Sequence, residues 1–231
     1  MSKSIEEKIE DNAKNQLRQF GIKYYTKTDS INSEIDDALK KSVSKSGGNG
    51  GNYPDIKVLL PMPGNRPLPV MIEVKGTKGR LIKANDKGDV FNLTDKGEPN
   101  YTNIKNYAVN GAVHYTESII NYSRSYHDGI AIGINGYESS ANNISTEYGV
   151  YFVSSENFLL PKKIAEYTDL SFLQDSNLEK LQRRIEDIYI TDEEKENRSH
   201  DFENQIETAL QHLNQNMHDN LNSNFAYTKH L

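Results

Sequence analysis

Residues 53–76 read Tyr-Pro-Asp-Ile-Lys-Val-Leu-Leu-Pro-Met-Pro-Gly-Asn-Arg-Pro-Leu-Pro-Val-Met-Ile-Glu-Val-Lys-Gly, and this stretch decides the fold. Two apolar segments, 55–60 and 69–75, lie on either side of a turn that is rich in proline. Proline fixes its own backbone and lacks an amide donor, so it suits turns and strand edges. The pattern therefore predicts two strands that pair as a β-hairpin.

The predicted hairpin carries charged side chains where apolar ones are expected. Successive side chains of a strand point to opposite faces, so Glu73 and Lys75 share one face. Ile72 and Val74 then point into the opposite layer. An acid and a lysine in an otherwise apolar strand are costly unless they have a task. If the two strands pair, Asp55 lies beside them, and the three charged residues form a candidate site.

The three residues suit metal-dependent cleavage of a phosphodiester bond. Mg²⁺ prefers hard oxygen ligands, and Mn²⁺ is expected to substitute for it. Asp55 and Glu73 supply two such ligands, and the main-chain carbonyl of Val74 is a third candidate. Lys75 is placed to orient or deprotonate the attacking water and to offset charge on the phosphate. The chain has no cysteine and no histidine pair at ligand spacing, which argues against zinc.

A helix is predicted over residues 3–20, because apolar residues recur at helical spacing and Gly21 follows. Glu6 is the acid nearest to the apolar stripe of this helix, so it is a candidate fourth member of the site. The alternative is a solvated glutamate that merely flanks the stripe, and the sequence leaves both open.

The rest of the chain alternates between helices and strands. Helices are predicted at 31–45, 102–123 and 177–189, strands at 129–135 and 148–154, a glycine-rich loop at 46–52, and a long loop at 80–101. The two strands are apolar on both faces, which is typical of central strands between two helical layers. Asn110 and His114 share a helix face, either as a polar rim or near the site. We detect no internal repeat.

Composition limits the classes of protein. The 231 residues carry a net charge of −6, which disfavours a stand-alone nucleic-acid binder. The basic residues Lys57, Arg66, Lys75, Lys78, Arg80, Lys83, Lys87, Lys96 and Lys105 gather around the candidate site. They form either a phosphate-binding patch or an ordinary solvated surface. The polar N-terminus, the lack of a long apolar run and the absence of cysteine lead us to expect a soluble cytoplasmic protein without a membrane partner.

Composition shifts after Tyr189. Residues 190–231 have a helical stripe and no strand pattern, with apolar residues at Ile206, Leu210, Leu213, Met217 and Leu221. We expect residues 1–189 to form one domain and residues 190–231 to form a helical linker that docks elsewhere.

A family resemblance extends these expectations. The order of a helix, Pro54-Asp55 and then Glu73-Val74-Lys75 resembles the PD-(D/E)XK nucleases. The segments at 107–115, 130–136 and 213–219 resemble the N-terminal nuclease region of restriction-modification polypeptides, in which an adenine-N6 methyltransferase follows, as in type IIG and related type I-like enzymes.

This resemblance implies an α/β fold with a mixed central β-sheet flanked by helices. It also implies Mg²⁺-dependent, site-specific cleavage of double-stranded DNA, with methyltransferase and target-recognition domains as partners in the same polypeptide or complex. By motif matching, Asp55, Glu73 and Lys75 are the catalytic acids and lysine, and Glu6 is the first-helix glutamate.

The chain departs from the full pattern of such polypeptides. It has no Asn-Pro-Pro-Tyr-type methylase motif, no glycine-rich cofactor motif and no helicase phosphate loop. We therefore expect a nuclease domain or the N-terminal piece of a longer protein. Two alternatives remain: a non-catalytic DNA-binding or assembly domain that keeps the nuclease fold, and a buried ion pair with a purely structural role.

Overall fold

The computed structural model describes residues 3–64, 66–140, 143–157, 159–189, 206–207, 210–211 and 213–215. The chain divides into two compact units, Met1–Ile188 and Tyr189–Leu231. In the second unit the described residues are helical. The remainder of the predicted 190–231 linker, including Met217 and Leu221, lies outside the described residues.

The elements follow the predicted alternation of helices and strands. In chain order they are α1 (Ile5–Gln19), β1 (Tyr24–Thr26), α2 (Ser33–Lys41), β2 (Ile56–Met62), β3 (Arg66–Lys75), α3 (Tyr101–Asn106), α4 (Ala108–Tyr122), β4 (Asp128–Ser140), β5 (Asn143–Ser154), β6 (Lys162–Ala165) and α5 (Leu178–Tyr189). Three short 3-10 helices complete the described part, at Ser155–Asn157, Ser171–Leu173 and Asp175–Asn177.

Within the described residues, six strands form one mixed sheet in the order β1-β2-β3-β4-β5-β6. β3 and β4 are parallel, and the other neighbouring pairs are antiparallel. A parallel pair needs a long crossover connection, and α3 and α4 supply it. The predicted hairpin is present, with Ile56 opposite Ile72. The predicted class, an α/β fold with a mixed sheet flanked by helices, is confirmed.

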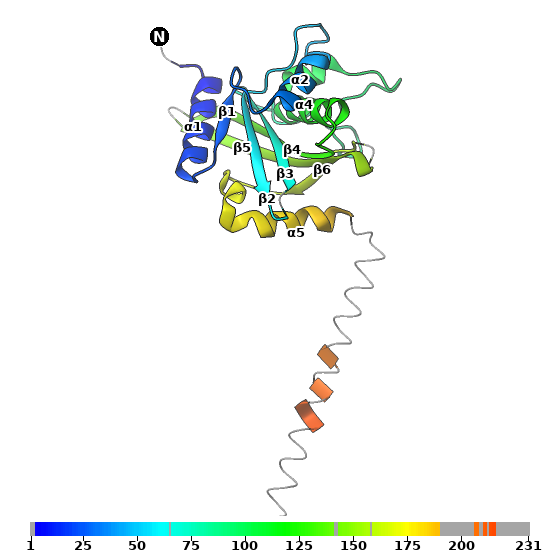
Figure 1. Cartoon of the computed structure of the whole chain (residues 1–231). Helices are drawn as coiled ribbons and strands as arrows, with labels where there is room; N and C mark the ends of the chain where they lie inside the picture. The colour runs from blue at the N-terminus through cyan, green and yellow to red at the C-terminus, as the bar shows by residue number, and fades with distance from the viewer. Residues whose placement is uncertain are drawn as a thin grey trace, which may run out of the picture. The chain divides into compact units, whose positions relative to one another are not determined.

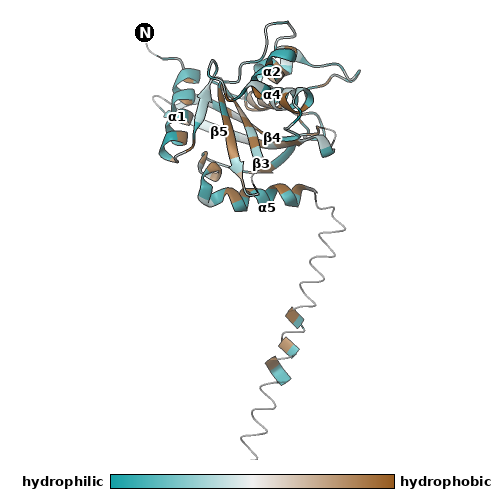
Figure 2. Cartoon of the chain, in the orientation of Figure 1, coloured by the Kyte–Doolittle hydropathy of each residue, from teal (hydrophilic) through white to brown (hydrophobic). Residues whose placement is uncertain are grey.

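Helices cover both faces of the sheet (Figure 1). On one face, α1 and α5 pack on a core that includes Ile72 and Val74 of β3. On the other face, α2 and α4 pack on Met71. Figure 2 shows apolar residues concentrated on the strands and polar residues on the outward sides of the helices. The two layers explain why the central strands are apolar on both faces.

The helix predicted over 102–123 is wrong in one respect, because it breaks at Tyr107. This residue is extended, with φ −123° and ψ 139°, and separates α3 from α4. The first amides of α4 donate to the preceding loop, from Ala108 to the Arg80 carbonyl (2.9 Å) and from Val109 to the Leu81 carbonyl (2.8 Å). Tertiary hydrogen bonds thus satisfy the amides at the start of a new helix.

Two similar turns organise the predicted loop at 80–101. In the first, the Asn85 amide donates to the Asp89 carbonyl (2.9 Å), and in the second the Thr94 amide donates to the Glu98 carbonyl (2.7 Å). Each turn contains Asp-Lys-Gly, and its glycine has a positive φ. The segments 83–91 and 92–100 therefore form a short repeat, which corrects the expectation that the chain has none.

Asn110 of α4 holds the starts of both turn segments. Its Oδ1 accepts the Lys83 amide (2.9 Å), and its Nδ2 donates to the Lys83 carbonyl (3.1 Å) and to Asn92 Oδ1 (2.9 Å). The Asn110 side chain is fully buried, so these bonds satisfy it in place of water. The hydrogen bonds of Asn110 therefore hold the 80–101 loop on α4, which is a structural role.

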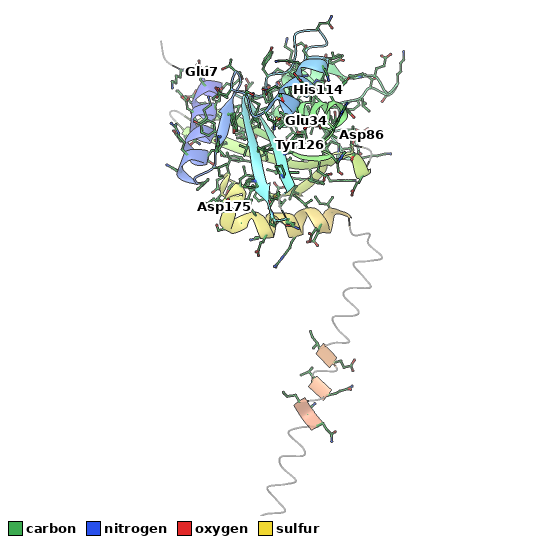
Figure 3. All side chains as sticks on the ribbon, in the orientation of Figure 1. Glu7, Glu34, Asp86, His114, Tyr126 and Asp175 are labelled. Atoms are coloured by element: carbon green, nitrogen blue, oxygen red, sulfur yellow. The ribbon has the colours of Figure 1, made fainter. Side chains whose placement is uncertain are left out.

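Polar contacts hold the region where α2 meets α4. Figure 3 labels Glu34, His114 and Tyr126 in this region. His114 Nε2 lies 2.8 Å from the Val43 carbonyl, and burial lowers its pKa. Tyr126 accepts a hydrogen bond from Asn32 Nδ2 (2.9 Å). His114 therefore contacts the backbone just after α2.

Glu117 of α4 makes the stability of the fold depend on pH. Burial raises the pKa of its carboxyl from 4.5 to about 8. Between these values the folded protein keeps a proton that the unfolded chain releases, so stability falls as the pH rises through this window. We expect Glu117→Gln to leave stability nearly unchanged at pH 4.5 and to raise it at pH 8, on the order of 1 kcal/mol or more.

Urea unfolding at several pH values measures this effect. Glu179→Gln, at an exposed position of α5, is the matched control and is expected to follow the wild type at every pH. A parallel pH profile for Glu117→Gln and the wild type would show that the Glu117 carboxyl is ionised in the folded protein.

Candidate active site

Asp55 lies immediately before β2, beside the end of β3. Its side chain is buried, and its two oxygens have different partners. Oδ2 accepts the backbone amide of Val74 (2.7 Å), while Oδ1 pairs with Lys27 Nζ (2.7 Å). The β2–β3 register places Asp55 next to Glu73, since Ile56 is opposite Ile72. The hairpin therefore positions the first acid with a backbone hydrogen bond.

Glu73 is fully buried, and its two carboxylate oxygens also have different partners. Oε2 accepts the hydroxyl of Tyr115 on α4 (3.2 Å). Oε1 faces two ammonium groups, Lys45 Nζ and Lys75 Nζ, each at 2.5 Å. Burial, followed by the charge of Glu73, raises the pKa of Tyr115, so the phenol stays protonated as the donor. One oxygen of Glu73 is thus held by the fold, and the other is held by lysines.

Val74 connects the two acids to the lysine. Its amide is bound to Asp55, and its carbonyl accepts a hydrogen bond from Lys75 Nζ (3.3 Å). Lys75 shares the face of Glu73, as strand alternation predicted. The structure therefore brings Asp55, Glu73, Lys75 and the Val74 carbonyl together, as the sequence predicted.

Glu6 approaches this cluster from α1. The helix begins with a capping box between Ser4 and Glu7, which turns Glu7 back onto the helix end. Gly76 permits the approach, because a Cβ there would lie 2.5 Å from the Glu6 backbone nitrogen. Glu6 remains exposed in a groove of about 760 Å³ that Lys27 also lines.

The charges of the cluster act on the carboxyl of Glu6. Although the residue as a whole is exposed, desolvation of its carboxyl raises its pKa; Lys75 opposes this, and the charges of Asp55 and Glu73 add to it. Among the described contacts, Glu6 makes no direct hydrogen bond or ion pair with the three residues. Its predicted role as a fourth site residue stays a prediction.

Lys27, Lys45 and Tyr115 are site residues that the sequence did not indicate. Lys27 follows the short strand β1, which was not predicted, and Lys45 lies between α2 and the glycine-rich loop. The pattern around Tyr115 indicated only an apolar helix face. Each of the three reaches the site across more than twenty residues of sequence, and local patterns carry no signal for such contacts.

Three of the basic residues near the site have partners within the protein. Lys57 is buried and donates to the Asp29 carbonyl (2.5 Å), and the Arg80 guanidinium lies 5.0 Å from the centre of the Tyr107 ring. Lys75 is paired with Glu73. The acids of the two turns further divide the positive charge of the 80–101 loop. Three of the nine basic residues are therefore engaged by partners within the protein. A phosphate-binding patch at the others stays a prediction.

The oxygen atoms of the site suit a small, hard cation. Asp55 Oδ1, Glu73 Oε1 and the Val74 carbonyl face lysine ammonium groups, so all three are placed where positive charge is already stabilised. Oxygen ligands are what Mg²⁺ and Mn²⁺ prefer. In the part of the chain that the structure describes, no group of three or more histidine, cysteine, aspartate or glutamate side chains is arranged to hold a metal ion. Two carboxylates and a carbonyl are thus the oxygen atoms that could hold such a cation, and metal binding stays a prediction.

The fold and the site together define a class of domain. A mixed six-stranded sheet among the described residues, with helices on both faces, carries two carboxylates and a lysine at the end of its central hairpin. This architecture is consistent with a restriction-endonuclease-like fold.

Comparison with known proteins points in the same direction. The chain is similar to the type II restriction enzyme and methyltransferase RM.BcgI of Heyndrickxia coagulans, with 28% identity over 157 residues. The match covers 68% of this chain and 22% of that protein. No protein-family model matches the chain, and no solved structure matches it significantly. The similarity links the chain to restriction-modification proteins.

One further finding concerns membranes. Among the helices that the structure describes, none is both long enough and apolar enough to span a lipid bilayer.

Proposed function

We propose that this chain is a Mg²⁺-dependent endonuclease domain that hydrolyses phosphodiester bonds of double-stranded DNA in a restriction-modification system. The observation that carries the proposal is the convergence of Asp55, Glu73 and Lys75 at the ends of two paired strands. The similarity to RM.BcgI supports the link to restriction-modification. Site-specific, type IIG-like cleavage is part of the proposal.

Asp55 Oδ1, Glu73 Oε1 and the Val74 carbonyl would hold the cation. When bound, Mg²⁺ supplies an activated water and charge stabilisation at the phosphate. The protein keeps its two acids in place through their other oxygens, with Val74 holding Asp55 and Tyr115 holding Glu73. The ligand oxygens are thereby preorganised, so little reorganisation is needed during the reaction.

Lys75 acts on the water and the phosphate in this proposal. Its Nζ reaches both Glu73 Oε1 and the Val74 carbonyl, so it lies among the proposed metal ligands. From there it orients the attacking water and stabilises the negative charge that builds on the phosphate. Glu6, across the groove, is proposed to hold a water at the edge of the site.

Partner domains are proposed from the relative's organisation. RM.BcgI is named as both a restriction enzyme and a methyltransferase, and this chain matches about a fifth of its length. We infer that methyltransferase and target-recognition domains, in the same polypeptide or complex, supply the sequence specificity. The net charge of −6 agrees with DNA affinity that resides partly elsewhere.

A plasmid cleavage assay tests the function. The protein is incubated with supercoiled DNA and Mg²⁺ or Mn²⁺, and with EDTA as the control. We expect nicked or linear DNA only with the divalent cation. The partner domains are included in a parallel reaction, because they are proposed to supply DNA affinity. Uncut DNA in both reactions, at saturating metal and DNA, would overturn the proposal.

One observation favours a second candidate, a non-catalytic domain in which the buried ion pairs have a purely structural role. Lysines already neutralise both buried acids, so the ion pairs alone account for their burial. Calorimetry with Mn²⁺ separates the two candidates, since a purely structural ion cluster is not expected to bind the cation. Binding that depends on Asp55 favours the nuclease.

A further inference from the structure

Each buried acid of the site has one oxygen that the fold holds and one that a loop lysine holds. For Asp55, Oδ2 is bound to a backbone amide and Oδ1 is paired with Lys27. For Glu73, Oε2 is bound to a buried phenol and Oε1 is paired with Lys45 and Lys75. The lysines therefore contact the same two oxygens that are proposed to hold the metal.

The three lysines differ in how firmly they are held. Lys75 lies on β3, and its side chain is 15% exposed. The side chains of Lys45 and Lys27 are 30% and 50% exposed, and both residues lie in connections between elements. The backbone N–H of Lys45 donates a hydrogen bond to Asn52 Oδ1 (3.0 Å), so the backbone of Lys45 is held while its side chain reaches Glu73. Lys27 and Lys45 are thus the two more exposed lysines of the site, and both lie outside its strands and helices.

Electrostatic repulsion by a bound cation would favour the movement of Lys27 and Lys45 away from the two acids. A divalent cation bound at Asp55 Oδ1 and Glu73 Oε1 would compete with the two lysines for these oxygens, and like charges in contact with one carboxylate repel each other. Such repulsion is relieved when the ammonium groups turn to a phosphate, which brings negative charge. Lys27 already lines the groove beside the site, so it has an open path away from Asp55.

We propose that Lys27 and Lys45 are exchangeable cations of this site. Each holds a carboxylate oxygen while no metal is present, yields it to the divalent cation, and then binds a phosphate of the DNA backbone. Lys75 keeps its position throughout, because it belongs to the central strand. The proposal rests on the proposed nuclease function and adds two positioning residues to the site.

The proposal predicts opposite effects of one substitution on two ligands. Lys45→Met and Lys27→Met remove a competitor for the metal, so each is expected to bind Mn²⁺ about tenfold more tightly than the wild type. The same variants lose a phosphate contact, so the slope of log K against log salt for DNA binding is expected to fall by about 1. A simple metal-ligand or structural role would not produce this pair of opposite changes.

The experiment uses isothermal titration with Mn²⁺ alone, and DNA binding in Ca²⁺ at several salt concentrations. Lys41→Met is the matched control, because Lys41 is exposed near Lys45 and has no ion pair among the described residues. Lys45→Arg keeps the charge and is expected to resemble the wild type in both assays. Thermal melting verifies that every variant is folded.

Unchanged or weaker Mn²⁺ binding by Lys45→Met and Lys27→Met overturns the exchange, even if the protein cuts DNA. Tighter Mn²⁺ binding with an unchanged salt slope overturns the phosphate role. Tighter binding in a protein that fails the plasmid assay supports the exchange of cations and removes the nuclease function. The two proposals therefore fail in different measurements.

Discussion

Replacing Glu73 with glutamine is expected to abolish cation-dependent DNA cleavage, with a loss of about a thousandfold or more. Glutamine keeps the size of the side chain and its acceptor for Tyr115, but it removes the charge that holds the cation at Oε1. Asp55→Asn is expected to have the same effect, because it removes the charge at Oδ1. Lys75→Met is expected to lose a similar factor while keeping Mn²⁺ binding.

The measurement is the plasmid assay with calorimetry alongside. Glu73→Gln and Asp55→Asn should lose Mn²⁺ binding and cleavage together, whereas Lys75→Met should lose cleavage alone. Glu179→Gln, an exposed glutamate on α5, should behave as the wild type. If all three site variants cut DNA at the wild-type rate, these residues are not the catalytic site.

Gly133→Ala is expected to cause a large loss of stability. A Cβ at this position of β4 would lie 2.4 Å from the Val109 nitrogen, 2.6 Å from Val109 Cγ2 and 2.8 Å from the Ala108 carbonyl carbon. The backbone of α4 cannot easily retreat, because its first amides are bonded to the loop at Arg80 and Leu81. Overpacking of this kind costs about 1–3 kcal/mol or more.

The effect is measured as the free energy of unfolding in urea. Gly50→Ala is the control, since a Cβ there meets no atom within 4 Å and the backbone φ is not positive. We also expect Gly133→Ala to weaken Mn²⁺ binding, because α4 carries Tyr115, which holds Glu73. Equal stability of the two variants would show that α4 shifts on the sheet at little cost.

Much of the architecture was predictable because it depends on local patterns. The proline-rich turn between two apolar segments predicted the hairpin, and strand alternation placed Glu73 and Lys75 on one face. The apolar residues on both faces of the segments that form β4 and β5 predicted that these strands lie buried between two helical layers. These features are properties of neighbouring residues, and neighbouring residues are what a single sequence displays.

Other features were not predictable, for a common reason. The break at Tyr107 depends on hydrogen bonds from α4 to the 80–101 loop, and β1 and β6 are short edge strands that exist through pairing. The strands predicted at 129–135 and 148–154 extend into the polar segment between them, because β4 and β5 supply each other with hydrogen-bond partners there. In each case a distant segment decides the local structure.

The sequence by itself determined the catalytic hypothesis: Asp55 before one strand, and Glu73 and Lys75 on one face of the next. Only the tertiary structure decided which oxygen of each acid is held by the fold and which faces a lysine. That division depends on Tyr115, Lys27 and Lys45, whose contacts with the acids are long-range. The physical reason is burial, because a carboxylate that is removed from water needs all of its hydrogen-bond and charge partners within the protein, and these come from distant parts of the chain.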